Sequence, residues 1–280
     1  MSMRKPDGVC LTVAPNGAHE GRWTHPALPV TPLQIAAEAR ACRAAGASIL
    51  HLHVRDGQGR HSLDVGLYRE AIAAVREVSD VVVQPSTECA GKYAPDDMIA
   101  VFQQLRPEML SVNLQELVAA GKSDDCARAC EFLAEMSLAG TVPQYIVYSI
   151  SQLEALKRWQ ADGWLPQARP YILLVLGRRG EEASARELLT YLRVLPEEWD
   201  WGVCAFGRME LDGVLHAALL GGHCRVGFEN NLYSPCGHQL GDNAEQVARL
   251  SGILGVLGKR VMTPNEVRTY FGLPKGVPND

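Results

Sequence analysis

The feature that most constrains this chain is a regular alternation of short apolar runs with longer helical patterns, from one end to the other. The apolar runs are short and almost uniformly apolar, so neither of their faces is suited to water. Such runs are typical of buried parallel strands. The predicted strands cover residues 8–14, 48–54, 80–86, 109–114, 142–149, 171–177, 201–207 and 224–230.

A helical pattern follows each predicted strand. The first helix has clear ends: Thr31 is the N-cap, Pro32 lies in the first turn, Gln34 completes a capping box, and Gly46 is suited to the C-cap. Further helices are predicted over residues 63–78, 94–105, 123–140, 151–163, 184–195, 211–222 and 243–259.

Eight strand–helix pairs within 280 residues predict an α/β fold, the (β/α)8 TIM barrel. Thr263 and Glu266 repeat the capping box and begin a C-terminal tail helix over residues 263–273. An open doubly wound sheet is the alternative, but no glycine-rich turn follows the first strand. Because the composition shows no break or linker, we expect a single catalytic domain over residues 1–280.

Charge and cysteine content narrow the class of protein. The net charge of −5 offers no basic patch for nucleic acid, and no apolar run approaches the ~18 residues of a membrane span. The basic start lacks the long apolar region of a signal peptide. The eight cysteines are scattered and form no CxxC pair, as in proteins with reduced thiols. We therefore expect a cytoplasmic protein with no nucleic-acid or membrane partner.

The ends of the predicted strands carry the candidate chemistry, because TIM barrels place their sites at the carboxyl ends of the strands. His51 and His53 share one face of the second strand, since side chains alternate. Barrel closure would bring Glu229, at the end of the eighth strand, to the same point. Two imidazoles and a carboxylate with an open position make a catalytic zinc site, and non-haem iron uses the same ligand types. Two satisfied core histidines are the alternative.

Another barrel family with an HxH motif is less compatible with this chain. Metal-dependent amidohydrolases carry HxH on the first strand and add histidines on middle strands. Here the motif falls on the second strand, and no histidine occurs between His61 and His216. The middle strands therefore cannot supply those ligands.

A basic residue on the eighth strand is a candidate for substrate binding. Arg225 shares parity with Gly227 and Glu229, which predicts an inward position beside the metal. A buried guanidinium needs an anionic partner, either an internal carboxylate or a substrate carboxylate held by two hydrogen bonds. Neutral donors at nearby strand ends would complete a pocket for a small oxyacid, although each can also serve as a loop cap. They are Ser86, Thr87, Ser111 and Asn113.

Several motifs taken together resemble a known family. They are "TVAPNGA", "HPALPVTPLQIAAEARACRAAGASILHLHVRD", "HSLD", "QPST", "GGHCRVGFENNLY" and "TPNEVR". Over nearly its whole length the chain resembles the β-keto acid cleavage enzymes, whose named member is 3-keto-5-aminohexanoate cleavage enzyme. The resemblance implies a metal-dependent (β/α)8 barrel that condenses a β-keto acid with acetyl-CoA. The adduct is then cleaved to acetoacetate and a new acyl-CoA. The resemblance also implies a homo-oligomer, namely a tetramer.

The resemblance assigns roles to particular positions. It places the family's zinc ligands on His51, His53 and Glu229, with other divalent metals possible, and its active-site arginine on Arg225. Substrate-holding positions fall on Ser86 of the "STG" motif and on a hydroxyl–x–Asn pair. The members of that pair are Ser111 and Asn113, and Asn16 occupies a further position that is polar in the family.

The chain also departs from the family pattern. Asn230 stands where the family commonly has the aspartate that partners the arginine, and Gln144 stands where it commonly has a glutamate. We place Asn230 among the catalytic residues, but an amide cannot act as a base. The family's "STGG" is "STEC" here, which adds Glu88 near the barrel mouth. Two consequences are open: the substrate carries a second anionic group, or Glu88 turns inward and compensates.

Two other functions remain open from the residues. One is a metal-dependent carbon–carbon lyase or hydrolase that cleaves a β-dicarbonyl compound without CoA. The other is a barrel that binds a metal and a keto acid without turning it over.

Overall fold

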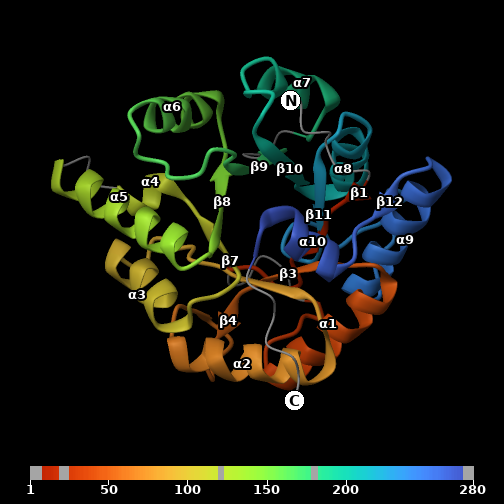
Figure 1. The fold of residues 1–280 in the computed structure, drawn as a ribbon. Coiled ribbons are helices and arrows are strands. Elements are labelled where there is room, and N and C mark those ends of the chain that lie inside the picture. Colours follow the sequence, from red (N-terminus) through yellow and green to blue (C-terminus); the bar gives the residue numbers. More distant parts are fainter. Residues whose placement is uncertain (1–7, 19–24, 119–122, 178–181, 274–280) are drawn as a thin grey trace.

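The computed structural model contains eight parallel strands that curve into a barrel (Figure 1). The structure describes residues 8–18, 25–118, 123–177 and 182–273. Hydrogen-bonded neighbours run in the order β6-β3-β2-β11-β10-β9-β8-β7. The strands are β2 (Leu11–Val13), β3 (Ile49–Leu52), β6 (Val82–Pro85), β7 (Met109–Val112), β8 (Val142–Val147), β9 (Tyr171–Leu176), β10 (Asp200–Ala205) and β11 (His223–Val226).

The two ends of this sheet meet and nearly close the barrel. The hydroxyl of Thr87, just after β6, donates a hydrogen bond to the backbone carbonyl of Ser111 in β7 (2.7 Å). Strand β2 lies between β11 and β3, as barrel closure requires. The predicted TIM-barrel fold is confirmed.

Helices surround the strands, and each predicted helix is present (Figure 1). The first helix begins and ends as expected, because Thr31 accepts from the Gln34 N–H and Gly46 takes the left-handed conformation with a φ of 119°. The ring consists of α1 (Pro32–Ala45), α2 (Val65–Val78), α3 (Pro95–Leu105), α5 (Ser123–Leu138), α6 (Ile150–Ala161), α7 (Ala185–Leu192), α8 (Glu210–Leu219) and α9 (Asn243–Val256). Two short helices were not predicted, α4 (Leu114–Leu117) and the 3₁₀ turn η1 (Gly207–Met209).

Two predicted strands are each divided in the structure. In the first, β1 (Gly8–Val9) pairs with β12 (Arg260–Val261), and only β2 joins the barrel. Cys10 separates the two parts because its N–H donates to the Nδ1 atom of His223. In the second, β4 (Val54–Arg55) leaves the barrel after His53 and pairs with β5 (His61–Ser62).

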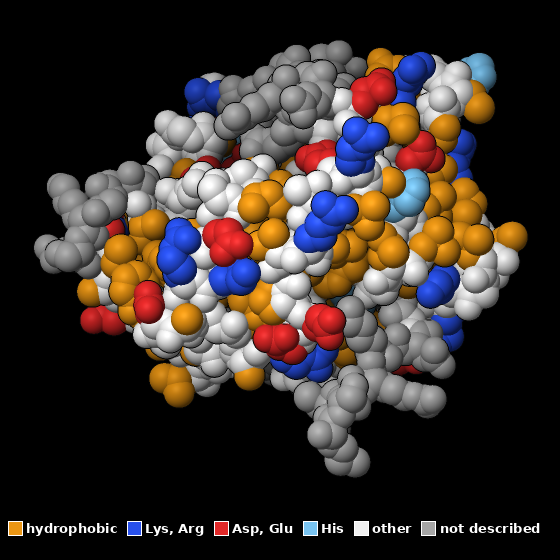
Figure 2. Space-filling model, turned by 90° about the horizontal axis from the view of Figure 1, so that it is seen from above, with side chains coloured by type: hydrophobic (Ala, Val, Ile, Leu, Met, Phe, Trp, Pro, Cys, Tyr) orange, Lys and Arg blue, Asp and Glu red, His pale blue; other side chains and the backbone are white. Residues whose placement is uncertain are grey.

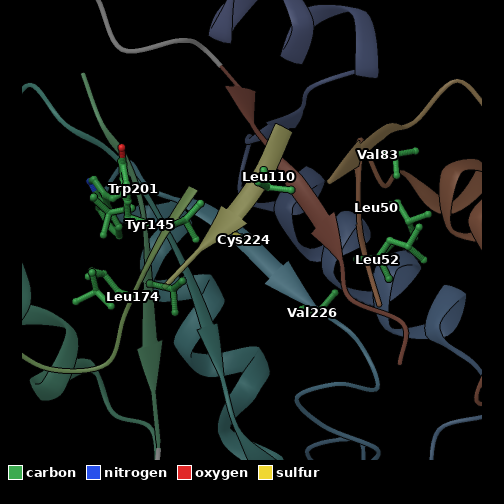
Figure 3. Close-up of a cluster of buried hydrophobic side chains, with 14 of the residues drawn as sticks. Leu50, Leu52, Val83, Leu110, Tyr145, Leu174, Trp201, Cys224 and Val226 are labelled. Atoms are coloured by element: carbon green, nitrogen blue, oxygen red, sulfur yellow. The ribbon is translucent and has the colours of Figure 1, made fainter. Parts of the chain in front are cut away.

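The core lies on both sides of the strands. Outward-facing residues such as Leu50, Leu52 and Val226 join one hydrophobic cluster beneath the helices (Figure 3). Inside the barrel, Ile49 and Met109 belong to a second cluster with residues of the tail helix α10 (Pro264–Phe271) and the segment after it. Helix α10 lies in the middle of the ring in Figure 1 and packs at the amino ends of the strands. The carboxyl ends are therefore the end available to a ligand.

The surface carries both charged and apolar side chains. Acidic and basic side chains are intermixed with hydrophobic ones on the face drawn in Figure 2. Among the described residues, no helix has the length and apolar character needed to cross a membrane. All eight cysteines are free thiols.

Candidate metal and substrate site

Two histidines and one glutamate meet at the carboxyl end of the barrel. His51 lies on the inward face of β3, and His53 comes directly after the last residue of that strand. Both side chains are buried. Their Nε2 atoms lie 3.1 Å apart, and the Oε2 atom of Glu229 lies 3.5 Å from His51 Nε2 and 3.4 Å from His53 Nε2. Two ligands ~2.0 Å from a tetrahedral zinc ion are about 3.3 Å apart. The three ligand atoms therefore have the mutual spacing that one small divalent cation requires.

The protonation of His51 also suits a metal ligand. Gln84 is its register partner on β6, and the Oε1 atom of Gln84 lies 2.9 Å from His51 Nδ1. A donor proton on Nδ1 leaves the Nε2 lone pair facing the cluster. Burial, followed by the positive charge of Arg225, lowers the pKa of His51 to about 3, so its imidazole is neutral. The Oε2 atom of Glu229 is buried without a hydrogen-bond partner among the described residues. These residues fit a bound cation.

Glu229 reaches the cluster by a different route from the one predicted. The strand expected over residues 224–230 ends at Val226, and a turn follows. Gly227 has a φ of 141°, and a Cβ atom there would lie 2.2 Å from the carbonyl oxygen of Ala14. The chain therefore turns at Gly227, and the strand alternation that was expected to place Glu229 does not extend to it. The prediction that Glu229 lies near the histidines is nevertheless correct.

Buried polar side chains from two helices hold this turn. Glu210 of α8 accepts a hydrogen bond from the Gly227 N–H (3.2 Å), and Asn243 of α9 accepts one from the Phe228 N–H (2.7 Å). Glu210 also accepts from the side chain of Gln246 (2.6 Å). Burial raises the pKa of Glu210 well above its usual value. Neither Glu210 nor Asn243 was predicted, because only the folded chain shows that their helices meet at this turn.

A glycine packs directly against the Glu229 side chain. Gly17 has a φ of 66°, and a Cβ atom there would lie 2.6 Å from Glu229 Cγ. The carbonyl of Gly17 accepts a hydrogen bond from the Arg55 guanidinium (2.8 Å), which fixes the loop. A glycine is therefore required at this position for the observed placement of Glu229.

Arg225 lies inside the barrel beside the ligands, as predicted. Its side chain is buried, pairs with Glu229 through Nη2, and donates from Nε to the Asn230 side-chain oxygen (3.3 Å). Burial raises the pKa of Glu229, but Arg225 and the two histidines together outweigh burial and hold the pKa well below its usual value. Of the two partners left open by the sequence, Arg225 here has the internal carboxylate. It also lines the cavity at the barrel mouth, where a substrate carboxylate can reach it.

The cavity at the barrel mouth collects most of the predicted residues. Its volume is about 40 Å³, and we call it the metal cavity. Its lining includes His51, Arg225, Glu229, Asn230 and four of the five predicted substrate-binding residues, Ser86, Thr87, Ser111 and Asn113. Asn16 does not line it. The Asn16 side-chain amide instead donates to the backbone carbonyls of Pro29 (3.1 Å) and His53 (3.0 Å), so it supports the histidine strand.

Some of these polar groups also hold the loops. Ser86 Oγ accepts from the Glu88 N–H (3.2 Å), Thr87 donates to the Ser111 carbonyl, and Asn113 caps α4. The side-chain Nδ2 atom of Asn230 is buried and has no hydrogen-bond partner among the described residues, although it faces this cavity. Such an unpaired amide donor beside a cavity is available to a water molecule or to a ligand oxygen.

Two further carboxylates line the metal cavity. Glu88 points inward, with its Oε2 atom 3.9 Å from His53 Nε2, whereas the carboxylate that pairs with Arg225 is Glu229. Glu116, from the short helix α4, accepts a hydrogen bond from the Cys89 N–H (3.1 Å). Burial raises the pKa of Glu116. Glu116 was missed because four helical residues directly after a strand leave no periodic signal.

The chain is similar to a known family and to several known proteins. The family model described as beta-keto acid cleavage enzyme matches residues 8–273. A 3-keto-5-aminohexanoate cleavage enzyme of Fusobacterium nucleatum subsp. nucleatum is 32% identical over 275 residues, which is 95% of this chain and 98% of that protein. A 3-oxoadipate:acetyl-CoA acetyltransferase of Cupriavidus necator is 26% identical over 275 residues, 94% of each chain.

A solved structure supports the fold. The apo structure of ObcA superposes with a TM-score of 0.70 at 20% sequence identity. The match covers 89% of this chain and 66% of that one, so this chain spans about two thirds of the length of ObcA.

Proposed function

This chain belongs to the beta-keto acid cleavage enzyme family, and we propose that it condenses a β-keto acid with acetyl-CoA and cleaves the adduct to acetoacetate and a new acyl-CoA. The observation that carries this proposal is the cluster of His51, His53 and Glu229 at the spacing of metal ligands, with Arg225 beside it. The cluster fits Zn²⁺, and other divalent cations use the same ligand types.

Each residue of the cluster has a defined task. A divalent cation held by His51, His53 and Glu229 would supply Lewis-acid activation of the substrate's keto group. Gln84 keeps the Nε2 lone pair of His51 directed at the cation position, and Gly17 leaves room for the Glu229 side chain. The chain thus presents two imidazoles and one carboxylate, with the remaining side open to the metal cavity.

Arg225 and the neutral donors hold the substrate. The guanidinium would bind the substrate carboxylate or a developing oxyanion, since charge-assisted hydrogen bonds are strong in a buried site. The side-chain oxygen of Asn230 accepts a hydrogen bond from Arg225 Nε and so orients the guanidinium. The unpaired N–H group of Asn230 is available to a ligand oxygen. Ser111 adds a hydroxyl at the opposite wall.

Proton transfer needs a base other than Asn230. Besides Glu229, the carboxylates lining the metal cavity in the described part of the chain are Glu88 and Glu116, so one of them takes the α-carbon proton. The resulting carbanion carbon forms a bond to the thioester carbonyl of acetyl-CoA. The released CoA thiolate then attacks the original keto carbon, and the bond from that carbon to the α-carbon breaks. The carboxyl group that took the proton returns it to the α-carbanion so formed, and acetoacetate and the new acyl-CoA leave.

The proposal includes the cellular location and the oligomeric state of the enzyme. Eight free thiols support a cytoplasmic location, because disulfides are rare there. The family resemblance implies a tetramer, and a self-association interface is supported by exposed apolar side chains at the neighbouring ends of α8 and α9. These are Leu219, Leu220, Val256 and Leu257. Sedimentation of the purified chain would test the assembly.

A coupled assay tests the reaction against its alternatives. The zinc-loaded chain is incubated with a panel of β-keto acids, with and without acetyl-CoA, and free acetoacetate and acyl-CoA are measured. Formation of both that depends on acetyl-CoA supports the proposal. Cleavage without acetyl-CoA would instead identify a lyase or hydrolase. Tight keto-acid binding without any product would identify a non-catalytic binding protein.

A further inference from the structure

A second cavity adjoins the metal cavity at the barrel mouth. Its volume is about 180 Å³, and it lies between the short helix α4 and helix α6, on the side of β8 (Figure 1). Asn113 and Ile146 line both cavities, so the two spaces meet at the ends of β7 and β8. We call this second space the tail cavity. Nothing in the reaction described above uses it.

The wall of the tail cavity is uncharged, and six of its ten described lining residues are apolar. Leu114 and Val118 contribute from the α4 side, and Ala155, Leu156 and Trp159 contribute from α6. Among the described residues that line it, none is lysine, arginine, histidine, aspartate or glutamate. Burial of an unpaired ammonium or carboxylate against such a wall is strongly unfavourable.

The polar groups in this wall already serve the helices. Asn113 accepts from the Gln115 N–H to cap α4, and Gln152 accepts from the Tyr148 N–H (2.5 Å). The hydroxyl of Ser151 shares a hydrogen bond with Ser149, the N-cap of α6 (2.8 Å). The contacts of Asn113 and Gln152 use their side-chain oxygens, so their amide nitrogens and the Gln115 side chain are the polar groups that a ligand in this cavity can meet.

The two cavities differ in size. The metal cavity, at about 40 Å³, has charged and polar groups on one part of its lining that suit a carboxylate and a keto group, and Ile146, Tyr148, Val175, Cys204 and Phe206 complete its lining. The tail cavity is more than four times larger, and an apolar cavity of ~150 Å³ in another protein holds benzene. It can therefore hold a short alkyl chain or one aromatic ring.

We propose that the tail cavity binds the side chain of the β-keto acid, and that this side chain is a neutral alkyl or aryl group. The carboxylate and keto groups would lie between Arg225 and the metal ligands, and the tail would pass Asn113 and Ile146 into the tail cavity. The inference rests on the proposed function, because it assumes a β-keto acid as substrate. It replaces the expectation of a second anionic group, since Glu88 and Glu116 already add negative charge to the mouth.

A substrate comparison tests the tail chemistry. We would measure kcat/KM at saturating acetyl-CoA for 3-oxopentanoate, 3-oxooctanoate, 3-oxoadipate and 5-amino-3-oxohexanoate. Burial of each additional methylene corresponds to about a 4-fold gain. We expect 3-oxooctanoate to exceed each of the other three by at least about tenfold. A preference for the carboxylate-tailed or ammonium-tailed acid would overturn the proposal.

Two variants of one helix locate the tail. Ala155→Phe fills the tail cavity and should lower the ratio of kcat/KM for 3-oxooctanoate over 3-oxopentanoate by at least about tenfold. Ala161→Phe places the same ring on the exposed end of α6 and should leave that ratio unchanged. If Ala155→Phe does not fold, Ala155→Asp puts a charge in the same wall and should lower the same ratio. A higher KM for acetyl-CoA with an unchanged ratio would assign the cavity to CoA instead.

A binding measurement separates this inference from the proposed function. Trp159 lines the tail cavity, so its fluorescence should change when 3-oxooctanoate binds to the metal-loaded chain, whether or not turnover follows. Ala155→Phe should weaken that response at least about tenfold, and Ala161→Phe should not. Absence of product with an intact fluorescence response would reject the proposed function alone. A response that is the same in wild type and Ala155→Phe would reject the tail assignment.

Discussion

Replacement of Arg225 by lysine tests whether the shape of the guanidinium is required in addition to its charge. Arg225 is buried and spans two acceptors, Glu229 through Nη2 and Asn230 through Nε. Lysine keeps the charge but has a compact ammonium group, so it loses the Asn230 contact and the planar fork. One hydrogen bond from the charged guanidinium to a substrate oxygen contributes about 1.5–3 kcal/mol. That loss corresponds to a decrease in kcat/KM of about 10- to 150-fold.

The assay is steady-state formation of acetoacetate at saturating acetyl-CoA, with metal content and melting temperature measured on the same samples. Arg69→Lys is the matched control, because Arg69 is exposed on α2 and donates one hydrogen bond to the Gln104 carbonyl. We expect Arg225→Lys to fold and bind metal normally. Wild-type kinetics in this variant would refute the substrate-binding role, and loss of the metal would show that Arg225 acts through the ligands.

Three further predictions follow from the site. The double variant of His51 and His53 to alanine should lose the bound cation by elemental analysis, and full occupancy would reject these ligands. Gly17→Ala should weaken metal binding, because its Cβ would displace the carboxylate ligand, with backbone strain of about 1–3 kcal/mol. Gly59→Ala has a similar φ of 75° in open space and should keep the metal. Burial raises the pKa of Glu210 above its ordinary 4.5, so the folded state retains a proton that the unfolded state releases. The free energy of unfolding should therefore fall as pH rises above 4.5. Urea unfolding at several pH values should show a weaker dependence of this free energy on pH in Glu210→Gln than in the wild type.

The fold was largely predictable because its signals are local. Thr31, Gln34 and Gly46 define a helix by hydrogen bonds among near neighbours, and the structure shows that capping box. The spacing of His51 and His53 places both imidazoles on one side because strand geometry fixes the alternation. Leu50 and Leu52 accordingly pack in the outer hydrophobic cluster.

The remainder of the site depends on contacts between distant segments. Gln84 faces His51 only because β3 and β6 pair in one particular register, which the sequence does not state. Glu229 meets the histidines through a turn that begins at Gly227, where a close approach to Ala14 ends the strand. Asn16 was expected in the substrate site, but its amide is used by two backbone carbonyls.

The most direct test of the central claim follows the acetyl group. The metal-loaded chain is given a β-keto acid and acetyl-CoA that carries a carbon isotope label at its carbonyl, and the acetoacetate is analysed by NMR. If the α-carbon of the β-keto acid attacks the thioester, the label must appear at the keto carbon of acetoacetate. The new acyl-CoA must then remain unlabelled. Unlabelled acetoacetate, or cleavage of the β-keto acid while the labelled acetyl-CoA stays intact, would contradict the proposed reaction.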